Sequence, residues 1–358
     1  MPKRCPNGSR RKPPKTGKCV KNTVIKKTSK KTFKKCPKNK ILNPKTNRCI
    51  IDNKQNRKKV EKISSNKSSS VNKLIMKECS KYNNLKPVNL NKIKYTGMSS
   101  NKFKLHFDSI PLTEVKYISE GSYGTVYVYG KGDIKIGVKV YKNVDDEEIE
   151  IINYLNRNKI SCNTINSRLI RIPGEYITIM DIMEGGLDKL KGKLTLPEIY
   201  KIIKEIAKNL NCLKNKKLSY TDLKSSNILF KCVDKKYSKI TLGDLGGICK
   251  VGSDNISTWS PFEYRYDKGH VICNEKTEVW GLGVILLELL NVSVNKFHWS
   301  NIDLETVGSI NSYVNNACKT HKLNNFKLKK HTGEELLKKM LETIPKNRIT
   351  ISTIINSI

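Results

Sequence analysis

The segment "YTDLKSSN", residues 220–227, constrains this chain more than any other. It follows a helical pattern and precedes "ILFKCV" (228–233), which is typical of a strand. A second acid, Asp244, ends the next strand-like run, 22 residues after Asp222. Two acids on loops at neighbouring strand ends, with Asn227 between them, indicate a site for a divalent cation and a phosphate. A solvated turn explains one such acid but not the combination.

Strand periodicity begins near residue 112. In "LTEVKYISEGSYGTVYVYGKGDIKIGVKVYK" (112–142), apolar and other residues alternate, and glycines interrupt the pattern. The glycines of "SEGSYGTV" lie between two strands, where a hairpin backbone can cover a large group such as the phosphates of a nucleotide. An ordinary β-turn is the alternative.

The segment "VDDEEIEIINYL" (144–155) predicts a helix, because Asp145 and Glu148 have capping-box spacing. Glu148 shares one helical face with Ile151, Ile152 and Leu155. An acid on an otherwise apolar face needs a cation, and Lys139 in the preceding strand is the candidate. Alternatively, Glu148 caps its own helix.

Charge is concentrated at the N-terminus. Residues 1–100 contain 30 Lys and Arg against 3 Asp and Glu, which gives +27 of the chain's net charge of +37. A segment so basic and so poor in aromatic residues is expected to be largely disordered. It favours a polyanion or an acidic protein as partner. A solubilising tail from a Lys/Asn-biased genome is an equal alternative.

The basic region contains a repeat. "CPNGSRRKPPKTGKCV" (5–20) and "CPKNKILNPKTNRCI" (36–50) both open with Cys-Pro and close with Pro-Lys-Thr, a Gly or Asn, a basic residue and Cys. Gly17 and Asn47 occupy equivalent positions and favour a tight turn that brings each cysteine pair together. Residues 51–110 are rich in Asn, Lys and Ser and are interpreted as a linker.

Further sequence features limit the cellular compartment in which the protein can function and the kinds of metal site that it can contain. The N-terminus lacks the apolar stretch of a secretion signal, and the longest apolar run, residues 279–290, is far shorter than the roughly 20 residues that span a bilayer. We therefore expect a soluble intracellular protein. The eleven cysteines contain no CxxC pair, which argues against a zinc ribbon, and most are expected to be reduced thiols in the core.

From residue 111 to 358 the chain resembles the eukaryotic-type serine/threonine protein kinases, with motifs in the family's order: "SEGSYGTV", "GVKV", "YTDLKSSN", "DLG", "SPFE", "EVWGLG" and "IPKNRIT". The resemblance implies an α+β, bilobal fold with a small β-rich lobe and a larger helical lobe. It implies that ATP is bound through Ser119, Gly121, Gly124, Val126, Lys139, Glu148, Asp181 and Met183, with Met180 as the gatekeeper. Asp222 is implied as the catalytic base and Lys224 as the γ-phosphate contact. Asn227 and Asp244 are the implied ligands of Mg²⁺ or Mn²⁺.

The departures from the family pattern carry their own expectations. Thr221 stands where an Arg normally binds an activating phosphate, so we expect activity without such phosphorylation. Ser119 replaces the first glycine of the phosphate loop, and Glu278 replaces an Asp. The extra residue in "SPFE" puts a Glu263–Arg348 ion pair in doubt. Packing of Ile248, Val251, Ile256 and Trp259 is expected to hold the segment after Asp244.

Residues 5–20 and 36–50 resemble the two-cysteine adaptor modules of large DNA viruses; the alternative is a coincidental Lys/Pro-rich duplication. This resemblance implies a viral kinase in the host cytoplasm or associated with the virion. The favoured function is ATP-dependent phosphorylation of Ser or Thr in proteins. A pseudokinase or adaptor acting through the tail is the second hypothesis, and a kinase for small molecules is the third. The sequence leaves the substrate and the oligomeric state open.

Overall fold

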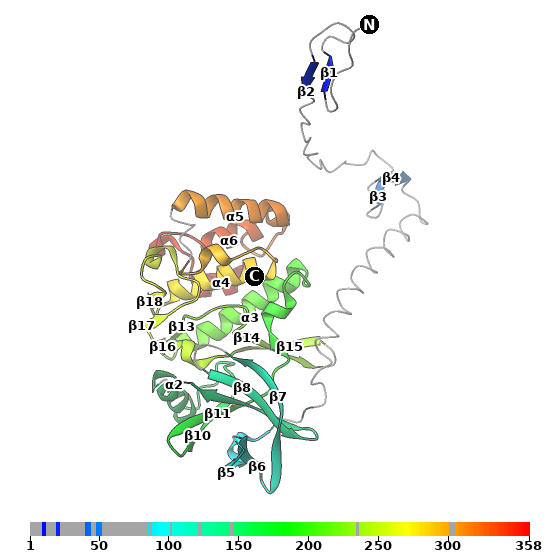
Figure 1. Cartoon of the computed structure of the whole chain (residues 1–358). Coiled ribbons are helices and arrows are strands. Elements are labelled where there is room, and N and C mark those ends of the chain that lie inside the picture. Colours follow the sequence, from blue (N-terminus) through cyan, green and yellow to red (C-terminus); the bar gives the residue numbers. More distant parts are fainter. Residues whose placement is uncertain are drawn as a thin grey trace. The chain divides into compact units, whose positions relative to one another are not determined.

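The computed structural model describes residues 9–11, 19–21, 40–43, 48–51, 85, 88–100, 102–120, 124–142, 146–233, 236–300 and 306–358. The chain divides into two compact units, Met1–Lys67 and Ser68–Ile358. Figure 1 shows both units in sequence colours.

The first unit contains two antiparallel hairpins, one in each cysteine repeat. Strand β1 (Ser9–Arg11) pairs with β2 (Cys19–Lys21), and β3 (Lys40–Asn43) pairs with β4 (Arg48–Ile51). The second cysteine of each repeat lies on the returning strand, opposite Arg11 in one hairpin and Leu42 in the other. The first cysteine of each repeat, Cys5 or Cys36, lies outside the described residues. Gly17 and Asn47 also lie outside the described residues, so the tight turns and the cysteine pairing both stay predictions.

A seven-stranded sheet forms the β-rich part of the second unit, in the order β10-β11-β9-β8-β7-β6-β5. All its strand pairs are antiparallel. Its strands are β5 (Ile93–Ser99), β6 (Lys102–Phe107), β7 (Ile110–Glu120), β8 (Gly124–Lys131), β9 (Ile134–Tyr141), β10 (Ser167–Ile172) and β11 (Glu175–Met180). The alternation from residue 112 onward thus correctly predicted strands. Strands β7 and β8 pair antiparallel on either side of residues 121–123, which lie outside the described residues.

Residues 88–110 correct the expected linker. They form the short helix η1 (Leu90–Lys92) and the strands β5 and β6. Their buried side chains Leu90, Ile93, Phe103 and Leu105 join the core of the sheet. The Arg168 guanidinium on β10 also donates to the carbonyls of Leu90 and Ile93, at 2.9 and 3.0 Å. The Lys- and Asn-rich composition concealed two strands in which alternate residues are apolar, so the folded unit begins before residue 112.

The larger part of the unit is helical, which confirms the expected bilobal α+β architecture (Figure 1). Its helices, with α2 beside the sheet, are α2 (Asp146–Arg157), α3 (Leu196–Lys214), α4 (Glu275–Leu289), α5 (Val307–His321), α6 (Gly333–Met340) and α7 (Ile351–Ser357). Asp145, the expected cap of α2, lies outside the described residues. Within the described ranges, no helix combines the length and apolar character that crossing a membrane requires.

Short strands and 3₁₀ turns frame the loops of the helical part. The strands are β12 (Gly185–Gly186), β13 (Leu218–Tyr220), β14 (Ile228–Val233), β15 (Lys236–Leu242), β16 (Ile248–Lys250), β17 (Asp254–Ile256) and β18 (His270–Ile272). The 3₁₀ turns are η2 (Leu187–Leu190), η3 (Leu245–Gly247), η4 (Phe262–Tyr264), η5 (Asn295–Phe297), η7 (Leu323–Asn325) and η8 (Pro345–Asn347). Helix α4 is the centre of this part, because every residue from Thr277 to Leu289 is buried. A helix that is apolar on nearly all sides is stable only inside a core.

The revised start of the folded unit makes a testable prediction. Leu105→Ala should lower the free energy of unfolding by about 2–5 kcal/mol, because the side chain is fully buried. Lys104→Ala, at the exposed neighbouring position, should change it by less than about 0.5 kcal/mol. Urea denaturation followed by circular dichroism measures both. Equal stability of the two variants would place residues 88–110 outside the core after all.

Candidate functional site

An ion-pair cluster joins the sheet to the helical part. The ammonium of Lys139 on β9 lies 2.9 and 2.7 Å from the two carboxylate oxygens of Glu148 on α2. The same nitrogen lies 3.2 Å from Oδ1 of Asp244. The structure thus contains the pairing predicted for Glu148, despite the short interval between the two residues in the sequence. Three charged groups from β9, α2 and the loop after β15 meet at one point.

Electrostatics keep Lys139 charged. Burial alone would lower the pKa of Lys139, but the carboxylates of Asp244 and Glu148 outweigh it and raise that pKa above its usual value. Lys139 therefore stays an ammonium at neutral pH, as the neutralisation of a phosphate requires. Asp244 adopts a left-handed backbone, with φ of 45°, and its side chain makes no capping hydrogen bond. Its carboxylate thus remains available for contacts within the site.

Asp222, in the loop between β13 and β14, is held by both of its carboxylate oxygens. Oδ2 accepts hydrogen bonds from Lys224 Nζ at 2.8 Å and from Asn227 Nδ2 at 2.9 Å. Oδ1 accepts from the backbone N–H of Thr258 at 3.1 Å and from its hydroxyl at 2.6 Å. The orientation of the carboxylate is therefore fixed from two sides. These four hydrogen bonds use the roughly four acceptor positions of the carboxylate, so a substrate hydroxyl would replace one of them.

The residues predicted to bind ATP lie on β7, β8, β9, α2 and the segment after β11. Ser119 lies near the end of β7, Gly124 begins β8, and Val126 pairs with Lys139 across the sheet. Gly124 has a packing reason to be glycine, because a Cβ there would lie 2.3 Å from the Val140 carbonyl oxygen. Gly121 lies outside the described residues.

Asp181 and Met183 lie in the irregular segment that follows β11. The Asp181 N–H donates to the Asn166 carbonyl at 3.1 Å, and burial raises the pKa of the Asp181 carboxyl. Met180, just before them, packs over Gly137 of β9, where a Cβ would lie 2.8 Å from the Met180 Cγ atom. Sequence reasoning did not single out Gly137, although it directly precedes "VKV" on the strand of Lys139.

Two buried acids on α4 accept hydrogen bonds from residues 220–227, which carry the predicted base Asp222 and are called the catalytic loop from here on. Glu278 accepts a hydrogen bond from the Tyr220 N–H at 2.7 Å. Glu288 accepts from the Ser225 N–H and hydroxyl, both at 2.9 Å, and pairs with Lys191 at 2.7 Å. Glu278 thus fits where an Asp was expected. Glu288 was not predicted, although its place inside the apolar run 279–290 is the same kind of signal that predicted a partner for Glu148.

The segment after Asp244 is attached at its far end by Arg348. The Arg348 guanidinium donates to both carboxylate oxygens of Glu263, at 2.9 and 2.7 Å. It also donates to the carbonyls of Lys276 and Glu342. The arginine is fully buried. The extra residue in "SPFE" therefore does not prevent the pair that the sequence left in doubt, because the turn η4 carries Glu263 to Arg348.

Packing of this segment was predicted only in part. Ile248 and Trp259 are buried as expected, but Val251 and Ile256 are about half exposed, at 51% and 45%. Ile256 is the last residue of β17, opposite His270 of β18, and Val251 directly follows β16. Hydrogen bonds provide the rest of the attachment: the Ser257 hydroxyl donates to the Thr221 carbonyl at 2.9 Å.

The expectation of reduced core thiols is wrong for at least five cysteines, because Cys232 is disulfide-bonded as well as the four named next. Disulfides join Cys162 to Cys212 and Cys249 to Cys273, with Cα atoms 5.4 and 6.3 Å apart. Such distances permit a disulfide, and no sequence spacing could show them. Among the described residues, Cys318 is a free and buried cysteine, and burial raises the pKa of its thiol to about 11.

Comparison with known proteins agrees with this geometry. A family model, the protein kinase domain, matches residues 112–357. Mouse dual specificity protein kinase CLK1 is 25% identical over 309 residues, which covers 66% of this chain and 63% of CLK1. Serine/threonine-protein kinase STY46 of Arabidopsis thaliana is 25% identical over 191 residues, covering 48% of this chain and 32% of the relative.

Mouse ribosomal protein S6 kinase alpha-6 is 26% identical over 188 residues, which covers 48% of this chain and 24% of the relative. The chain therefore spans less than two thirds of the length of these curated relatives.

The buried acid Glu278 predicts a pH dependence of stability. Burial raises its pKa to about 8, against 4.5 for the ordinary residue. Between these values the folded protein keeps a proton that the unfolded chain has released. This stabilisation is complete below pH 4.5 and is lost as pH rises through 8, with a slope of at most about 1.4 kcal/mol per pH unit.

Glu278→Gln keeps an acceptor for the Tyr220 N–H and removes the titration. Its free energy of unfolding, measured by urea denaturation from pH 5 to 9, should fall less steeply than that of the unsubstituted protein. Glu150→Gln, at an exposed position on α2, is the control and should retain the original slope. Parallel curves for all three proteins would contradict a raised pKa of Glu278.

Proposed function

Because the chain belongs to the protein kinase family, we propose that it transfers the γ-phosphoryl group of ATP to Ser or Thr hydroxyls of protein substrates. One observation carries the proposal: Asp222 is held by both carboxylate oxygens, beside Lys224 and Asn227. A fixed carboxylate next to a fixed ammonium suits the abstraction of a hydroxyl proton during attack on a phosphate.

In the proposed reaction, Asp222 orients the substrate hydroxyl and accepts its proton. Lys224 lies 2.8 Å from that carboxylate and is near enough to neutralise charge on the transferred phosphoryl group. Lys139 neutralises charge on the α and β phosphates, and Glu148 keeps its ammonium in place. Positioning and charge neutralisation account for most catalysis in phosphoryl transfer.

The residues present fit a divalent cation. Asn227 commits its amide nitrogen to Asp222, which leaves the amide oxygen as a ligand. Asp244 contributes a carboxylate, and oxygen ligands of these two kinds are those that Mg²⁺ and Mn²⁺ prefer. When bound, such a cation would neutralise phosphate charge.

Specificity for Ser and Thr rests on the Lys two residues after the catalytic Asp, a pattern of serine/threonine kinases. The name of STY46 points the same way, whereas that of CLK1 describes a dual specificity kinase. Assays with Ser, Thr and Tyr peptides distinguish an enzyme specific for Ser and Thr from one of dual specificity.

The N-terminal unit is proposed to recruit partners. Each repeat contains a basic hairpin, in keeping with a viral two-cysteine adaptor module. Its charge favours a polyanion or an acidic protein. A viral kinase in the host cytoplasm, or one carried in the virion, is the setting that this resemblance suggests. A pseudokinase that acts only through this unit is the alternative, and intact Lys139, Asp222 and Asp244 count against it.

The assignment of the base is tested with Asp222→Asn. This change should lower turnover by roughly 10²–10⁴, because a positioned general base contributes about that much, while nucleotide binding stays nearly unchanged. Asp133→Asn, at an exposed turn between β8 and β9, is the control and should keep full activity. Transfer of labelled phosphate from ATP to a protein substrate measures turnover. Equal rates for Asp222→Asn and the control would refute the assignment.

Activity should require no phosphate on the segment after Asp244. Thr258 already donates its hydroxyl to Asp222, and the Ser257 hydroxyl is buried against the Thr221 carbonyl. Enzyme treated with phosphatase should therefore phosphorylate substrate at its full initial rate. A lag that shortens with enzyme concentration would instead indicate activation by autophosphorylation.

An acidic residue at position 258 should inhibit rather than activate. Thr258→Glu places a like charge beside Asp222 and should lower turnover at least about tenfold, since like charges about 4 Å apart repel by several kcal/mol outside bulk water. Thr258→Ser keeps the hydroxyl and is the matched control. Higher activity of Thr258→Glu than of Thr258→Ser would contradict this account.

Deletion of residues 1–67 tests the role of the N-terminal unit. This deletion leaves residues 88–110 in place, because they belong to the second unit. The shortened protein should retain its kinase activity and lose most salt-sensitive binding to heparin or DNA. The affinities of both proteins for heparin or DNA, measured between 50 and 200 mM salt, test this expectation. An unchanged affinity with the same salt dependence would move the polyanion site to the folded domain.

A further inference from the structure

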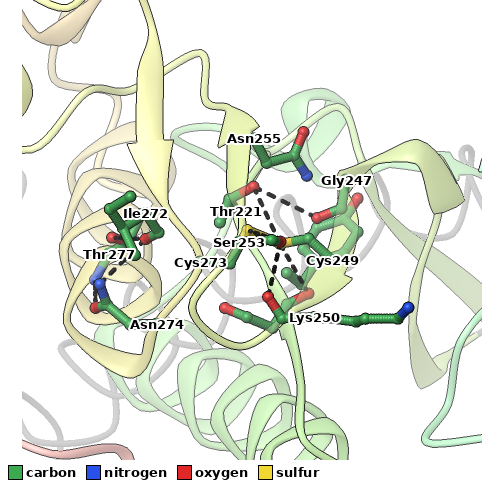
Figure 2. Close-up of a disulfide and its surroundings, with 12 residues drawn as sticks. Thr221, Gly247, Cys249, Lys250, Ser253, Asn255, Ile272, Cys273, Asn274 and Thr277 are labelled. Atoms are coloured by element: carbon green, nitrogen blue, oxygen red, sulfur yellow. Dashed lines mark hydrogen bonds between the residues drawn. A yellow bond between two sulfur atoms is a disulfide. The ribbon is translucent and has the colours of Figure 1, made fainter. Parts of the chain in front are cut away.

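The disulfide between Cys249 and Cys273 closes a loop that contains most of the segment following Asp244. Cys249 lies on β16, and Cys273 lies between β18 and α4 (Figure 2). Both residues are buried, with exposed fractions of 7% and 0%. Between them lie Thr258, which binds Asp222, and Glu263, which binds Arg348. The bond therefore fixes the base of the loop that carries these contacts.

Cys249 is attached to the strand that leads into the catalytic loop. Strand β16 pairs with β13, and Cys249 lies opposite Ser219 in that pairing. Its sulfur lies 3.7 Å from the Ser219 carbonyl oxygen and 4.0 Å from the Thr221 hydroxyl. Thr221 directly precedes Asp222. One end of the disulfide thus rests against the residue next to the proposed base.

Cys273 is attached to the most deeply buried helix. It directly precedes Asn274, whose side chain caps α4 by accepting from the N–H groups of Lys276 and Thr277. The Cys273 backbone exchanges hydrogen bonds with Gly252 and Ser253, both at 2.8 Å. The Ser253 hydroxyl lies 3.5 Å from the Cys273 sulfur (Figure 2). The disulfide therefore joins the catalytic-loop strand to the start of α4 through residues that are fixed on both sides.

The position of this bond matters because the usual charged attachment is lacking. Thr221 stands where an Arg would bind a phosphate on this segment. Arg265, a nearby alternative, donates to the Phe262 carbonyl and stacks on the rings of Phe262 and Tyr266. Lys224 is committed to Asp222 and Thr258. In the described part of the segment, the basic side chains that could bind a phosphate thus either contact other groups or, like Lys250, are exposed to solvent.

We propose that the Cys249–Cys273 disulfide is a redox-controlled clamp that holds this segment against the catalytic loop, in place of an activating phosphate. The clamp regulates the site of the proposed kinase and so rests on that function. Its switch is reduction by a dithiol, which breaks the S–S bond and leaves one thiol on each cysteine. Two electrons and two protons pass to the protein, and the reductant becomes its own cyclic disulfide.

The second disulfide offers a matched control. Cys162 lies in the loop between α2 and β10, and Cys212 lies on α3. The bond closes a longer loop, with a sequence separation of 50 against 24, and it does not include the segment after Asp244. Its loss should affect general stability but not the placement of Thr258. The two pairs thus separate a clamp from ordinary stabilisation.

The experiment compares the full-length protein with the double variants Cys249→Ser/Cys273→Ser and Cys162→Ser/Cys212→Ser, each with and without dithiothreitol. Mass spectrometry of non-reduced tryptic peptides reports which cysteines are linked. Phosphorylation of a peptide gives kcat and KM, titration with a fluorescent ATP analogue gives nucleotide affinity, and brief trypsin treatment reports opening of the segment at Lys250 and Lys268.

Reduction should lower kcat by roughly 10- to 100-fold, the size expected when a catalytic group is displaced by about 1 Å, and reoxidation should restore it. Nucleotide affinity should change less than about threefold, because Lys139, Glu148 and Asp244 lie outside the loop. Cleavage at Lys250 or Lys268 should become faster. The Cys249→Ser/Cys273→Ser variant should reproduce the reduced state without responding to dithiol, whereas Cys162→Ser/Cys212→Ser should respond as the unsubstituted protein does.

Several outcomes would overturn the clamp: full activity in a protein whose Cys249 and Cys273 are both thiols, or full activity of the Cys249→Ser/Cys273→Ser variant. If that variant does not fold, reduction of the unsubstituted protein decides the question. If reduction does not reach the buried bond, the variant decides it. Absence of phosphoryl transfer in every state would refute the kinase proposal instead, while the trypsin measurement would still report whether the disulfide holds the segment.

Discussion

The catalytic loop depends on two carboxyl groups that are buried inside α4. Glu278 and Glu288 lie ten residues apart on a helix with almost no exposed surface, and each accepts a backbone N–H from the loop that carries Asp222. Burial of an acid is costly unless its oxygens find donors. Here the donors are the Tyr220 and Ser225 N–H groups, so the loop and the acids satisfy one another. Displacement of the loop would leave two acids without these donors in the core.

Arg348 is a second buried charged group whose partners all lie inside the protein. A fully buried guanidinium must satisfy its N–H groups inside the protein, and four hydrogen bonds to Glu263, Lys276 and Glu342 do so at distances up to 2.9 Å. The ring of Trp280 on α4 lies below it, with 4.9 Å between the guanidinium carbon and the ring centre. Arg348 therefore ties the segment after Asp244 to α4. Loss of Glu263 would leave a buried charge uncompensated rather than merely remove one surface ion pair.

Local patterns in the sequence predicted much of the fold and part of the site. Alternation after residue 112 predicted β7 to β9, and an acid on an apolar helical face predicted the contact of Glu148 with Lys139. Residues 88–110 were missed because their few apolar residues are diluted by Lys and Asn, and only pairing with β7 makes them a core. The contact of Thr258 with Asp222 was not predicted, since a sequence shows the hydroxyl but not its hydrogen bond.

Long-range covalent and ionic contacts explain why the segment after Asp244 can be ordered without strong packing. Val251 and Ile256 contribute little burial, so hydrophobic contacts alone leave the middle of this segment weakly held. Its two ends, however, are both attached to α4: one through the Cys249–Cys273 bond beside Asn274, and the other through Glu263 and Arg348 beside Trp280. The catalytic loop is attached to the same helix through Glu278 and Glu288. The segment that carries Thr258 and the loop that carries Asp222 are thus both attached to α4. This common attachment places the two side chains close enough for the short hydrogen bond between them.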